Sequence, residues 1–349
     1  MTSAPFLRNA LIALILLGAA IAAPLLGPSN YTIGQLTLFF IWASIVVQWN
    51  LVFGVAGIMT LGQVATFAIG AYATGMSALY LGVPFWLAML FSIPAAVHFN
   101  LLLGVVTMRM RGEYVAIVTL ATAMLISALV VNDVSCFRQV NLVCFNFTGG
   151  SRGLIGYGDL GWAKMLGFKY RALGDYYLSL AVLFGGFILA LAVIHGPYGL
   201  AFRAIRDNEL YARSRGVDFR KYQLIVFALS AVATGLTGAV YAGTLKTVGP
   251  TVLDMNLLIF LLSMMVVGGR GSVWGPLLGG ATLMFADNVF QAFGAWRTGG
   301  LALVTLLFVI FYPGGLSAGL SQIFRAVTSR FTREKTTIEP RPAGQESAA

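Results

Sequence analysis

Long apolar stretches separated by short polar segments run through most of the chain. A helix that crosses the hydrocarbon core of a bilayer needs about 20 mostly apolar residues, and the chain offers about ten such stretches. They lie near residues 9–27, 34–53, 58–80, 84–108, 113–133, 176–196, 222–245, 254–269, 273–294 and 299–313. The pattern predicts an all-α integral membrane protein with about ten transmembrane helices, which form one transmembrane domain over residues 1–333.

The composition supports a membrane protein. Hydrophobic residues make up 58% of the 349-residue chain and charged residues 10%, whereas soluble domains average about 25% charged residues. The mean hydropathy is +0.85. A soluble domain of this composition would expose large apolar patches to water, so the soluble classes are excluded.

The formal net charge of +10 reflects an excess of Lys and Arg that is concentrated in a few polar segments. Cytoplasmic loops of membrane proteins are enriched in these residues. If the amino terminus is cytoplasmic, most basic residues fall inside, including the rich segment 203–221. We therefore expect both termini in the cytoplasm and do not ascribe the charge to nucleic-acid binding. The polar tail over 334–349 is predicted to be disordered.

The first apolar stretch has two interpretations. Arg8, the apolar run and Ala20-Ile21-Ala22 fit a cleaved signal peptide over about 1–22, which would leave nine transmembrane helices. Leu25 and Leu26 extend the run toward spanning length, which favours a retained helix. The orientation of everything downstream is the same in both cases.

The longest predicted extracytoplasmic loop covers residues 134–175 and holds both cysteines, Cys136 and Cys144. On the oxidising side of a bacterial membrane such a pair can form a disulfide, and the alternative is two reduced thiols in a hairpin. A disulfide would shape the loop rather than perform chemistry. The two histidines lie far from the cysteines, so the sequence predicts no metal site.

A basic loop over residues 197–221 separates the sixth and seventh predicted spans. At 100° per residue, residues 200–213 form a helix with a small-residue side and a charged side. The small-residue side holds Ala201, Ala204, Ile205, Asn208 and Ala212. The charged side holds Arg203, Arg206, Asp207, Leu210 and Arg213. On charge alone, an ordinary positive-inside loop neutralised by lipid headgroups is the favoured interpretation.

Residue spacing adds detail to this loop. Residues four apart on a helix can meet, which predicts an Arg203–Asp207 pair and a Glu209–Arg213 pair. Gly216 is expected to end the helix, and Asp218 suits the N-cap of the next membrane helix.

Six segments in order resemble one family of membrane proteins. Three of them are "NLVFGVAGIMTLGQVATFAIGAYATG" (50–75), "GLAFRAIRDNELYARSRGVDFRKYQLIVFALSAVATGLTGAVYA" (199–242) and "MMVVGGRGSVWGPLLGGA" (264–281). The others are "RGEYVAIVTLA" (111–121), "TGGSRGL" (148–154) and "FYPGGL" (311–316). Together they resemble the branched-chain amino acid ABC transporter permease family, the LivM-type subunits. Tyr211-Ala212-Arg213-Ser214 and the cysteine-containing loop 134–147 depart from the pattern of that family.

The resemblance implies a permease subunit of an ATP-driven importer in the bacterial inner membrane. The expected partners are two ABC ATPase subunits, a second homologous permease and an extracytoplasmic binding protein, with lipid around the spans. The loop 197–221 would hold the coupling helix that contacts an ATPase, through Arg203, Arg206, Asp207, Glu209 and Gly216. The implied substrate is a branched-chain or other hydrophobic amino acid, and the alternatives within the class are urea, short amides and small aromatic acids.

The residues themselves separate this function from two other classes. The sequence contains no G-x-x-x-x-G-K-[ST] motif, so ATP and Mg²⁺ are expected on the partner subunits and no enzyme activity is expected here. An ion-gradient-driven transporter usually needs ionisable groups inside its spans, and only Asp287 lies well inside one. With Asn288 it is a candidate cation site, but a structural role near the outer rim is favoured. A purely structural membrane subunit is the third class.

Neutral polar residues inside the spans are the candidates for substrate contact. These pathway candidates are Gln48, Asn50, Gln63, Thr66 and Thr119, because polar side chains that face lipid are costly. The alternative is that they form hydrogen bonds between helices, each worth about 0.6 kcal/mol. Small residues four apart, as in Ala231–Gly243 and Gly275–Gly279, predict close helix packing.

Overall fold

Helices make up most of the protein in the computed structural model, which describes residues 4–110, 112–140, 143–165, 167, 170–312 and 314–319. The first half holds α1 (Ala4–Ala22), the 3-10 helix η1 (Ala23–Leu26), α2 (Asn30–Asn50), the π-helix η2 (Leu51–Val55), α3 (Gln63–Tyr80), α4 (Phe85–Thr107) and α5 (Glu113–Val131). The second half holds α6 (Trp162–Met165), α7 (Arg171–His195), α8 (Pro197–Asp207), α9 (Glu209–Ser214), α10 (Phe219–Leu245), α11 (Met255–Gly268), α12 (Gly275–Phe290) and α13 (Arg297–Phe311). Three further 3-10 turns are η3 (Gly150–Arg152), η5 (Pro250–Leu253) and η6 (Gln291–Trp296).

Each of the predicted apolar stretches overlaps one helix of 14 or more residues. Seven helices in the described chain are long and apolar enough to cross a membrane. They are Phe6–Leu25, Asn30–Val55, Phe85–Thr107, Glu113–Val131, Arg171–His195, Phe219–Leu245 and Arg297–Gly319. The all-α multi-pass architecture is confirmed, whereas the number of ten spans stays a prediction because α3, α11 and α12 do not meet these criteria.

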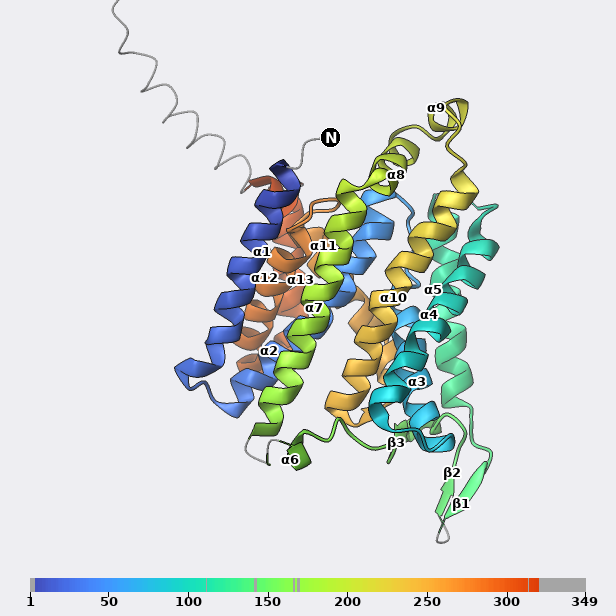
Figure 1. Ribbon diagram of the computed structural model, residues 1–349, viewed down its shortest axis with the longest axis vertical. Helices are drawn as coiled ribbons and strands as arrows, with labels where there is room; N and C mark the ends of the chain where they lie inside the picture. The colour runs from blue at the N-terminus through green and yellow to red at the C-terminus, as the bar shows by residue number, and fades with distance from the viewer. Residues whose placement is uncertain are drawn as a thin grey trace, which may run out of the picture.

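The polar connections separate into two ends of the helical body (Figure 1). The described amino terminus, α8 and α9 lie at one end, whereas α6 and the β1–β2 hairpin lie at the other. This arrangement agrees with the expectation that the amino terminus and loop 197–221 share one side of the membrane. Which side that is stays a prediction, and the tail 334–349 lies outside the described residues.

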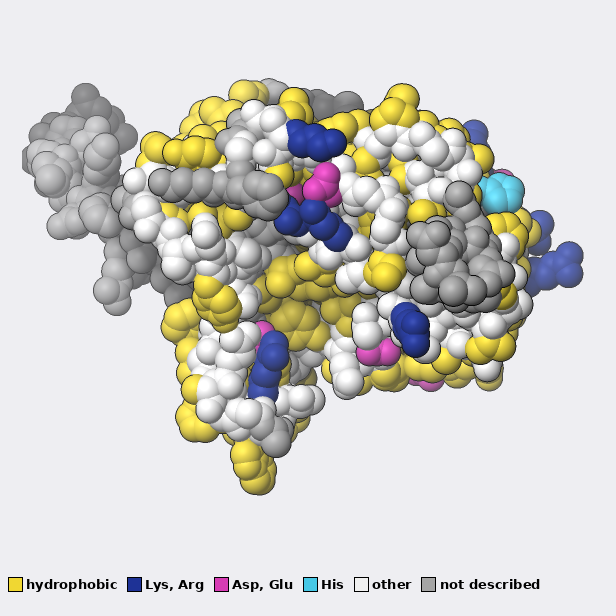
Figure 2. Space-filling model, turned by 90° about the horizontal axis from the view of Figure 1, so that it is seen from below, with side chains coloured by type: hydrophobic (Ala, Val, Ile, Leu, Met, Phe, Trp, Pro, Cys, Tyr) yellow, Lys and Arg dark blue, Asp and Glu magenta, His cyan; other side chains and the backbone are white. Residues whose placement is uncertain are grey.

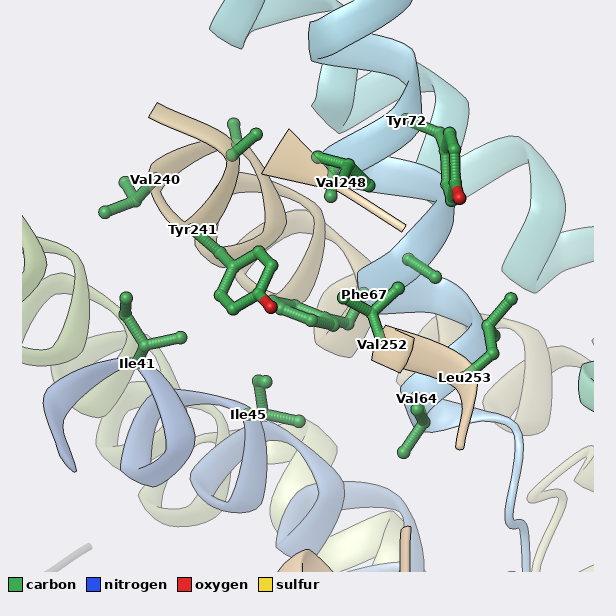
Figure 3. Packing of buried hydrophobic residues seen from close by; sticks show 14 of the residues in the cluster. Ile41, Ile45, Val64, Phe67, Tyr72, Val240, Tyr241, Val248, Val252 and Leu253 are labelled. Atoms are coloured by element: carbon green, nitrogen blue, oxygen red, sulfur yellow. The ribbon is translucent and has the colours of Figure 1, made fainter. Parts of the chain in front are cut away.

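The centre of the body is built on α10, which packs against α2, α3, α4 and α7. Figure 3 shows the apolar cluster where α2, α3, α10 and the segment after α10 meet. The rings of Phe67 and Tyr241 lie edge to face with centroids 5.2 Å apart, and Trp42 packs against Phe67 at 5.9 Å. Aromatic pairs favour such offset arrangements, which fix the mutual rotation of the three helices.

Small residues allow the closest helix contacts, as the sequence predicted. A Cβ atom on Gly235 of α10 would lie 2.5 Å from Ala96 Cβ and 2.7 Å from the Ser92 carbonyl oxygen of α4. On α12, a Cβ on Gly279 would overlap the backbone of Met264 on α11. Close backbone approach is how helices gain packing contacts in lipid, where the hydrophobic effect does not drive association.

Four short strands organise the far end of the molecule. β1 (Arg138–Val140) and β2 (Val143–Phe145) form an antiparallel hairpin, and β3 (Leu154–Ile155) pairs antiparallel with β4 (Thr247–Val248) after α10. The second pair ties loop 134–175 to the end of α10. Cys136 is disulfide-bonded. Cys144, the other cysteine of the sequence, lies on β2, where side chains fall outside the described part, so the pairing stays a prediction.

Two carboxylates fasten the same loop to the helices. The hydroxyl and the backbone N–H of Thr148 donate to Asp133 Oδ2 at 2.7 and 2.6 Å. These hydrogen bonds hold the pKa of Asp133 below its usual range. Asp159 accepts a charge-assisted hydrogen bond from Lys246, which lowers the pKa of that carboxyl. Loop 134–175 is therefore anchored to α5 and to the end of α10.

The first helix packs along α7. The hydroxyls of Tyr176 and Tyr177 donate to the carbonyls of Ala20 and Ile21 at 2.7 and 3.3 Å. Near its other end, Asn9 Oδ1 accepts a hydrogen bond from the indole N–H of Trp274 at 3.3 Å. These contacts give α1 a place in the helical body, and cleavage of residues 1–22 stays an untested alternative.

Candidate functional site

Loop 197–221 forms two helices instead of the single helix predicted over 200–213. Pro197 occupies the first turn of α8, where its fixed φ suits the helix and its missing N–H costs nothing. Asn208 then adopts an extended conformation (φ −159°, ψ 103°) and its side chain accepts a hydrogen bond from Tyr211 N at 3.0 Å, capping α9. Asn side chains compete with helical backbone hydrogen bonds in this way, so the break has a local cause that periodicity does not reveal.

The small-residue side of the loop packs against the protein itself. Three of its five predicted members, Ala201, Ile205 and Ala212, are buried, as is the neighbouring Phe202, whereas Ala204 and Asn208 are exposed. The outward side carries large apolar residues that are 58%, 75% and 60% exposed, namely Leu200, Leu210 and Tyr211. Exposed apolar side chains in a polar loop are candidates for contact with a partner protein. The surface open to a partner is thus apolar and charged rather than lined with alanine.

Arg203 connects α8 to the end of α7. Its Nη2 donates to the Ile194 carbonyl at 2.7 Å, and its Nε donates to the Gly199 carbonyl at 3.1 Å. A cationic side chain is favourable at the last carbonyls of a helix. In place of the predicted Arg203–Asp207 pair, these carbonyls hold the guanidinium. Arg203 therefore fixes the angle between α7 and α8.

Arg206 connects α8 to the π-helix after α2. Its Nη1 donates to the Gly54 carbonyl at 2.9 Å, and its Nε donates to Asp207 at 3.2 Å. Two glycines make room for the side chain: a Cβ on Gly57 would overlap Arg206, and a Cβ on Gly271 would lie 3.2 Å from Nη1. The side chain is 39% exposed, so it connects two elements of the protein and also reaches the surface.

Asn50 continues this connection to the turn between α11 and α12. Its Nδ2 donates to the Ser272 carbonyl, and its Oδ1 accepts from Gly271 N, both at 2.8 Å. A Cβ on Gly54 would overlap both Asn50 and the Gly271 backbone. We call Arg206, Gly54, Asn50 and Gly271 the glycine clamp. It joins α8, α2, α11 and α12 at one end of the molecule.

The remaining predicted residues of the loop take simpler positions. Glu209 and Arg213 form the predicted ion pair at 2.7 Å. Gly216 has a left-handed φ of +83°, which glycine adopts without strain, and it follows the end of α9 as expected. Asp218 caps α10 by accepting a hydrogen bond from Arg220 N at 3.0 Å. The structure brings the five predicted coupling residues together in one segment but does not test their role.

The predicted pathway residues are buried in contacts between elements of this chain. The amide of Gln48 donates to the Gly186 carbonyl on α7, and that of Gln63 donates to the Thr234 hydroxyl on α10. Thr66 donates to Asn100 Oδ1 at 3.1 Å. Thr119 accepts a hydrogen bond from Leu61 N at 2.9 Å. With Asn50, all five are at most 2% exposed. Their described hydrogen bonds are with other segments of this chain, and a role in substrate contact stays a prediction.

An open cavity lies elsewhere, between α2, α11, α12 and α13. Its volume is about 560 Å³, and Asp287 and Arg297 are among the lining residues. Asp287 receives two hydrogen bonds from Arg297, from Nε at 2.6 Å and from Nη2 at 2.7 Å. The carboxylate proposed as a structural group near the rim is thus paired. Within the described residues, no group of three or more His, Cys, Asp and Glu side chains is placed to hold a metal ion.

Comparison with known proteins identifies the family. The family model described as the permease component of the branched-chain amino acid transport system matches residues 31–312. The chain belongs to this permease family. It is thus a multi-pass membrane protein of the branched-chain transport class, and its relatives are named as permease components rather than as enzymes.

Curated relatives of the permease cover most of the chain. The high-affinity branched-chain amino acid transport system permease protein LivM of Escherichia coli K12 is 28% identical over 322 residues, which are 88% of this chain and 74% of the relative. The LivM protein of Salmonella typhimurium is 26% identical over 325 residues, with 88% and 75% coverage. The autoinducer 2 import system permease protein LsrC of Salmonella paratyphi B is 28% identical over 314 residues, with 87% and 86% coverage. No solved structure matches the permease significantly.

Proposed function

We propose that this permease is one transmembrane subunit of an ATP-driven importer for branched-chain or other hydrophobic amino acids in a bacterial inner membrane. Two ATPase subunits that bind ATP and Mg²⁺, a second homologous permease and an extracytoplasmic binding protein complete the machine. The named LivM relatives support the amino-acid substrate. The LsrC relative has a different substrate in its name, and urea, short amides and small aromatic acids are the other candidates.

The observation that carries the proposal is the pairing of an exposed docking surface with an internal connection in loop 197–221. Leu200, Leu210 and Tyr211 face outward, while Arg206 of the same segment donates to the Gly54 carbonyl at the end of α2. A segment that only balanced charge at the membrane would need neither feature. Together they suit a segment that binds an ATPase and transmits the movement of that ATPase to the transmembrane helices.

The mechanism follows from these contacts. ATP-driven closure of the partner ATPases displaces α8 and α9. Arg203 transmits that displacement to the end of α7, and Arg206 transmits it through the glycine clamp to α2, α11 and α12. A packed core of small residues responds by sliding between discrete arrangements rather than by compressing. The spans thereby change from outward to inward access.

The ion pairing of Asp287 argues against gradient coupling. Coupling to an ion gradient usually uses ionisable groups inside the spans, and the charge of Asp287, the candidate here, is balanced within the subunit by two hydrogen bonds from Arg297. The carboxylate that was the candidate for cation binding is therefore neutralised within the subunit. ATP-driven transport needs no such group in this chain.

The test is co-purification with the candidate ATPases, together with ATP-driven uptake in membrane vesicles. The variant Leu210→Ser/Tyr211→Ser removes exposed apolar area without touching the glycine clamp, and we expect it to lose both the ATPases and uptake. Phe293→Ser, which alters a residue 60% exposed in η6, is the matched control and should retain both. Unchanged ATPase binding and uptake in the Leu210/Tyr211 variant would reject the docking assignment.

A further inference from the structure

The cavity between α2, α11, α12 and α13 has a polar end and an apolar body. Figure 2 views the end of the molecule that carries α6 and the hairpin, and shows a hollow with a hydrophobic floor and charged side chains around it. The cavity of about 560 Å³ lies within the range of about 300–1,000 Å³ typical of small-molecule sites. The polar residues at its end are Gln35, Asn256, Asp287, Gln291, Arg297 and Thr298.

The charged pair at this cavity retains capacity to bind a ligand. Asp287 is 8% exposed and Arg297 is 47% exposed. A guanidinium has five N–H donors and a carboxylate about four acceptor positions, whereas the bond between these side chains uses Nε, one N–H of Nη2 and one position on each oxygen. Arg297 can therefore also bind a carboxylate, and Asp287 can also bind an ammonium group.

Neighbouring polar groups stiffen this end of the cavity. The hydroxyl of Tyr31 donates to Gln291 Oε1 at 2.7 Å and accepts a hydrogen bond from Gln35 Nε2 at 3.1 Å. The chain of contacts links the start of α2 to η6, directly before Arg297. The guanidinium itself is positioned by its two hydrogen bonds to Asp287, and preorganised polar groups lower the cost of binding.

The body of the cavity is apolar and aromatic. Trp42 and Leu38 of α2, Phe260 of α11 and Leu283 of α12 line it. Such a wall suits a branched aliphatic or aromatic side chain. Urea and short amides carry no net charges to match the pair and little apolar surface to match the wall.

We infer that this cavity binds an α-amino acid with an apolar side chain, with the ligand carboxylate at Arg297, the ammonium at Asp287 and the side chain against Trp42 and Phe260. The inference rests on the proposed function and adds a substrate site within the permease itself. It also places the site on helices that the glycine clamp controls, because α2, α11 and α12 run from the clamp to the cavity. Movement of the clamp therefore changes the spacing of the binding groups.

The test is chemical protection of a cysteine placed inside the cavity. Ser263→Cys lies on the cavity wall and is modified by a small maleimide in the purified complex of the permeases with their ATPases, in the absence of the binding protein. We expect L-leucine to slow this modification, whereas leucinamide, which lacks the carboxylate, and 4-methylpentanoate, which lacks the amine, should not. Thr32→Cys, exposed at the same end but outside the cavity lining, is the control that leucine should leave unprotected.

Changes to the charged pair give the second arm. In the Ser263→Cys background, Arg297→Gln should raise the half-protecting leucine concentration about tenfold or more, since it removes a two-pronged charged contact. Arg297→Lys, which keeps the charge but not the fork geometry, should give an intermediate value and guards against simple misfolding. Val289→Ala, two residues from Asp287, 49% exposed and outside the lining, should match the parent protein.

Three results would overturn the inference. Equal protection by leucinamide or 4-methylpentanoate would reject a zwitterion site, and protection by a long-chain alcohol alone would indicate a lipid site. Absence of leucine protection in a complex that retains ATP-driven leucine uptake would reject the cavity as the site while leaving the proposed function intact. Failure of the proposed function is detected separately: the parent protein would then neither bind the ATPases nor carry out ATP-driven uptake.

Discussion

The two ends of this permease differ in how basic side chains link one structural element to another. At the end formed by loop 197–221, Arg203 and Arg206 donate to backbone carbonyls of Ile194, Gly199 and Gly54. At the opposite end, Arg297 and Lys246 pair with carboxylates, Asp287 and Asp159. An arginine bound to the backbone of another helix makes the two helices move together. A side-chain ion pair can share its hydrogen-bonding groups with a ligand. The first end therefore suits transmission of movement between helices, and the second suits binding and release of a ligand.

The largest expected effect comes from a methyl group inside the glycine clamp. Gly54→Ala would place a Cβ against Asn50 and the Gly271 backbone, and forced overpacking of this kind costs about 3 kcal/mol. We expect loss of ATP-driven uptake and a lower unfolding midpoint in detergent. Gly34→Ala on α2, where a Cβ meets nothing within 4 Å, is the matched control. Normal transport by the Gly54 variant would show that the clamp tolerates strain and is not the connection.

The ion pair of the cavity should matter next. Arg297→Met leaves Asp287, which is 8% exposed, without its partner, and an uncompensated carboxylate there costs about 2 kcal/mol, less than for a fully buried pair. Adding Asp287→Asn should recover most of the lost stability without restoring leucine protection. Thermal unfolding of the single and double variants measures this coupling. If the losses of stability in the two single variants add up in the double variant, the two side chains act independently. The ion pair would then not distinguish this end of the molecule from the other.

Arg206→Gln should separate docking from coupling. The change removes the charged hydrogen bond to Gly54 at a cost of about 1 kcal/mol, but it leaves Leu210 and Tyr211 in place. We expect the ATPases to co-purify normally while uptake per ATP hydrolysed falls. Arg213→Gln, which breaks the pair with Glu209 and the contact of the guanidinium with the Phe219 ring, should change stability by about 0.5 kcal/mol and leave that ratio unaltered. If uptake per ATP hydrolysed falls in both variants, the effect is due to the loss of surface charge instead.

The smallest expected effect concerns pH at the far end. Because the folded-state pKa of Asp133 is lowered by Thr148, its contribution to stability is present above the unfolded-state pKa of about 3.9 and is lost as pH falls through the folded-state value. Thr148→Val should therefore cost about 0.5 kcal/mol at pH 7. The difference from wild type should vanish in strongly acidic solution. Unfolding midpoints across this range measure it, and a constant difference would exclude the titration of Asp133 as its cause.

The sequence anticipated those parts of the fold that depend on local pattern. Apolar runs located the long helices, small residues at Gly235 and Gly279 marked close contacts, and spacing of four found the Glu209–Arg213 pair. These features depend on residues within one helix or on one helix face. They can therefore be predicted without knowing which distant segments of the chain are in contact.

Other features depend on distant segments. Arg206 meets Gly54, 152 positions away, and spacing along the loop gives no indication of this partner. The Asp287–Arg297 pair closes across η6, because the chain kinks there and returns as α13. The interruption at Asn208 is local, and its signal was an Asn followed by Glu in a helical run, which fits a new N-cap.

The π-helical turn over Leu51–Val55 has one further consequence. It closes with a hydrogen bond from Ala56 N to the Leu51 carbonyl at 3.0 Å, and such a turn holds an additional residue relative to an α-helical one. At about 100° per residue, conversion of this turn to α-helical geometry would rotate the following segment by that angle about the axis of α2 and carry the Gly54 carbonyl away from Arg206. This turn lies directly beside loop 197–221. A movement of that loop can therefore rotate the membrane-spanning helix about its axis as well as shift it along its axis.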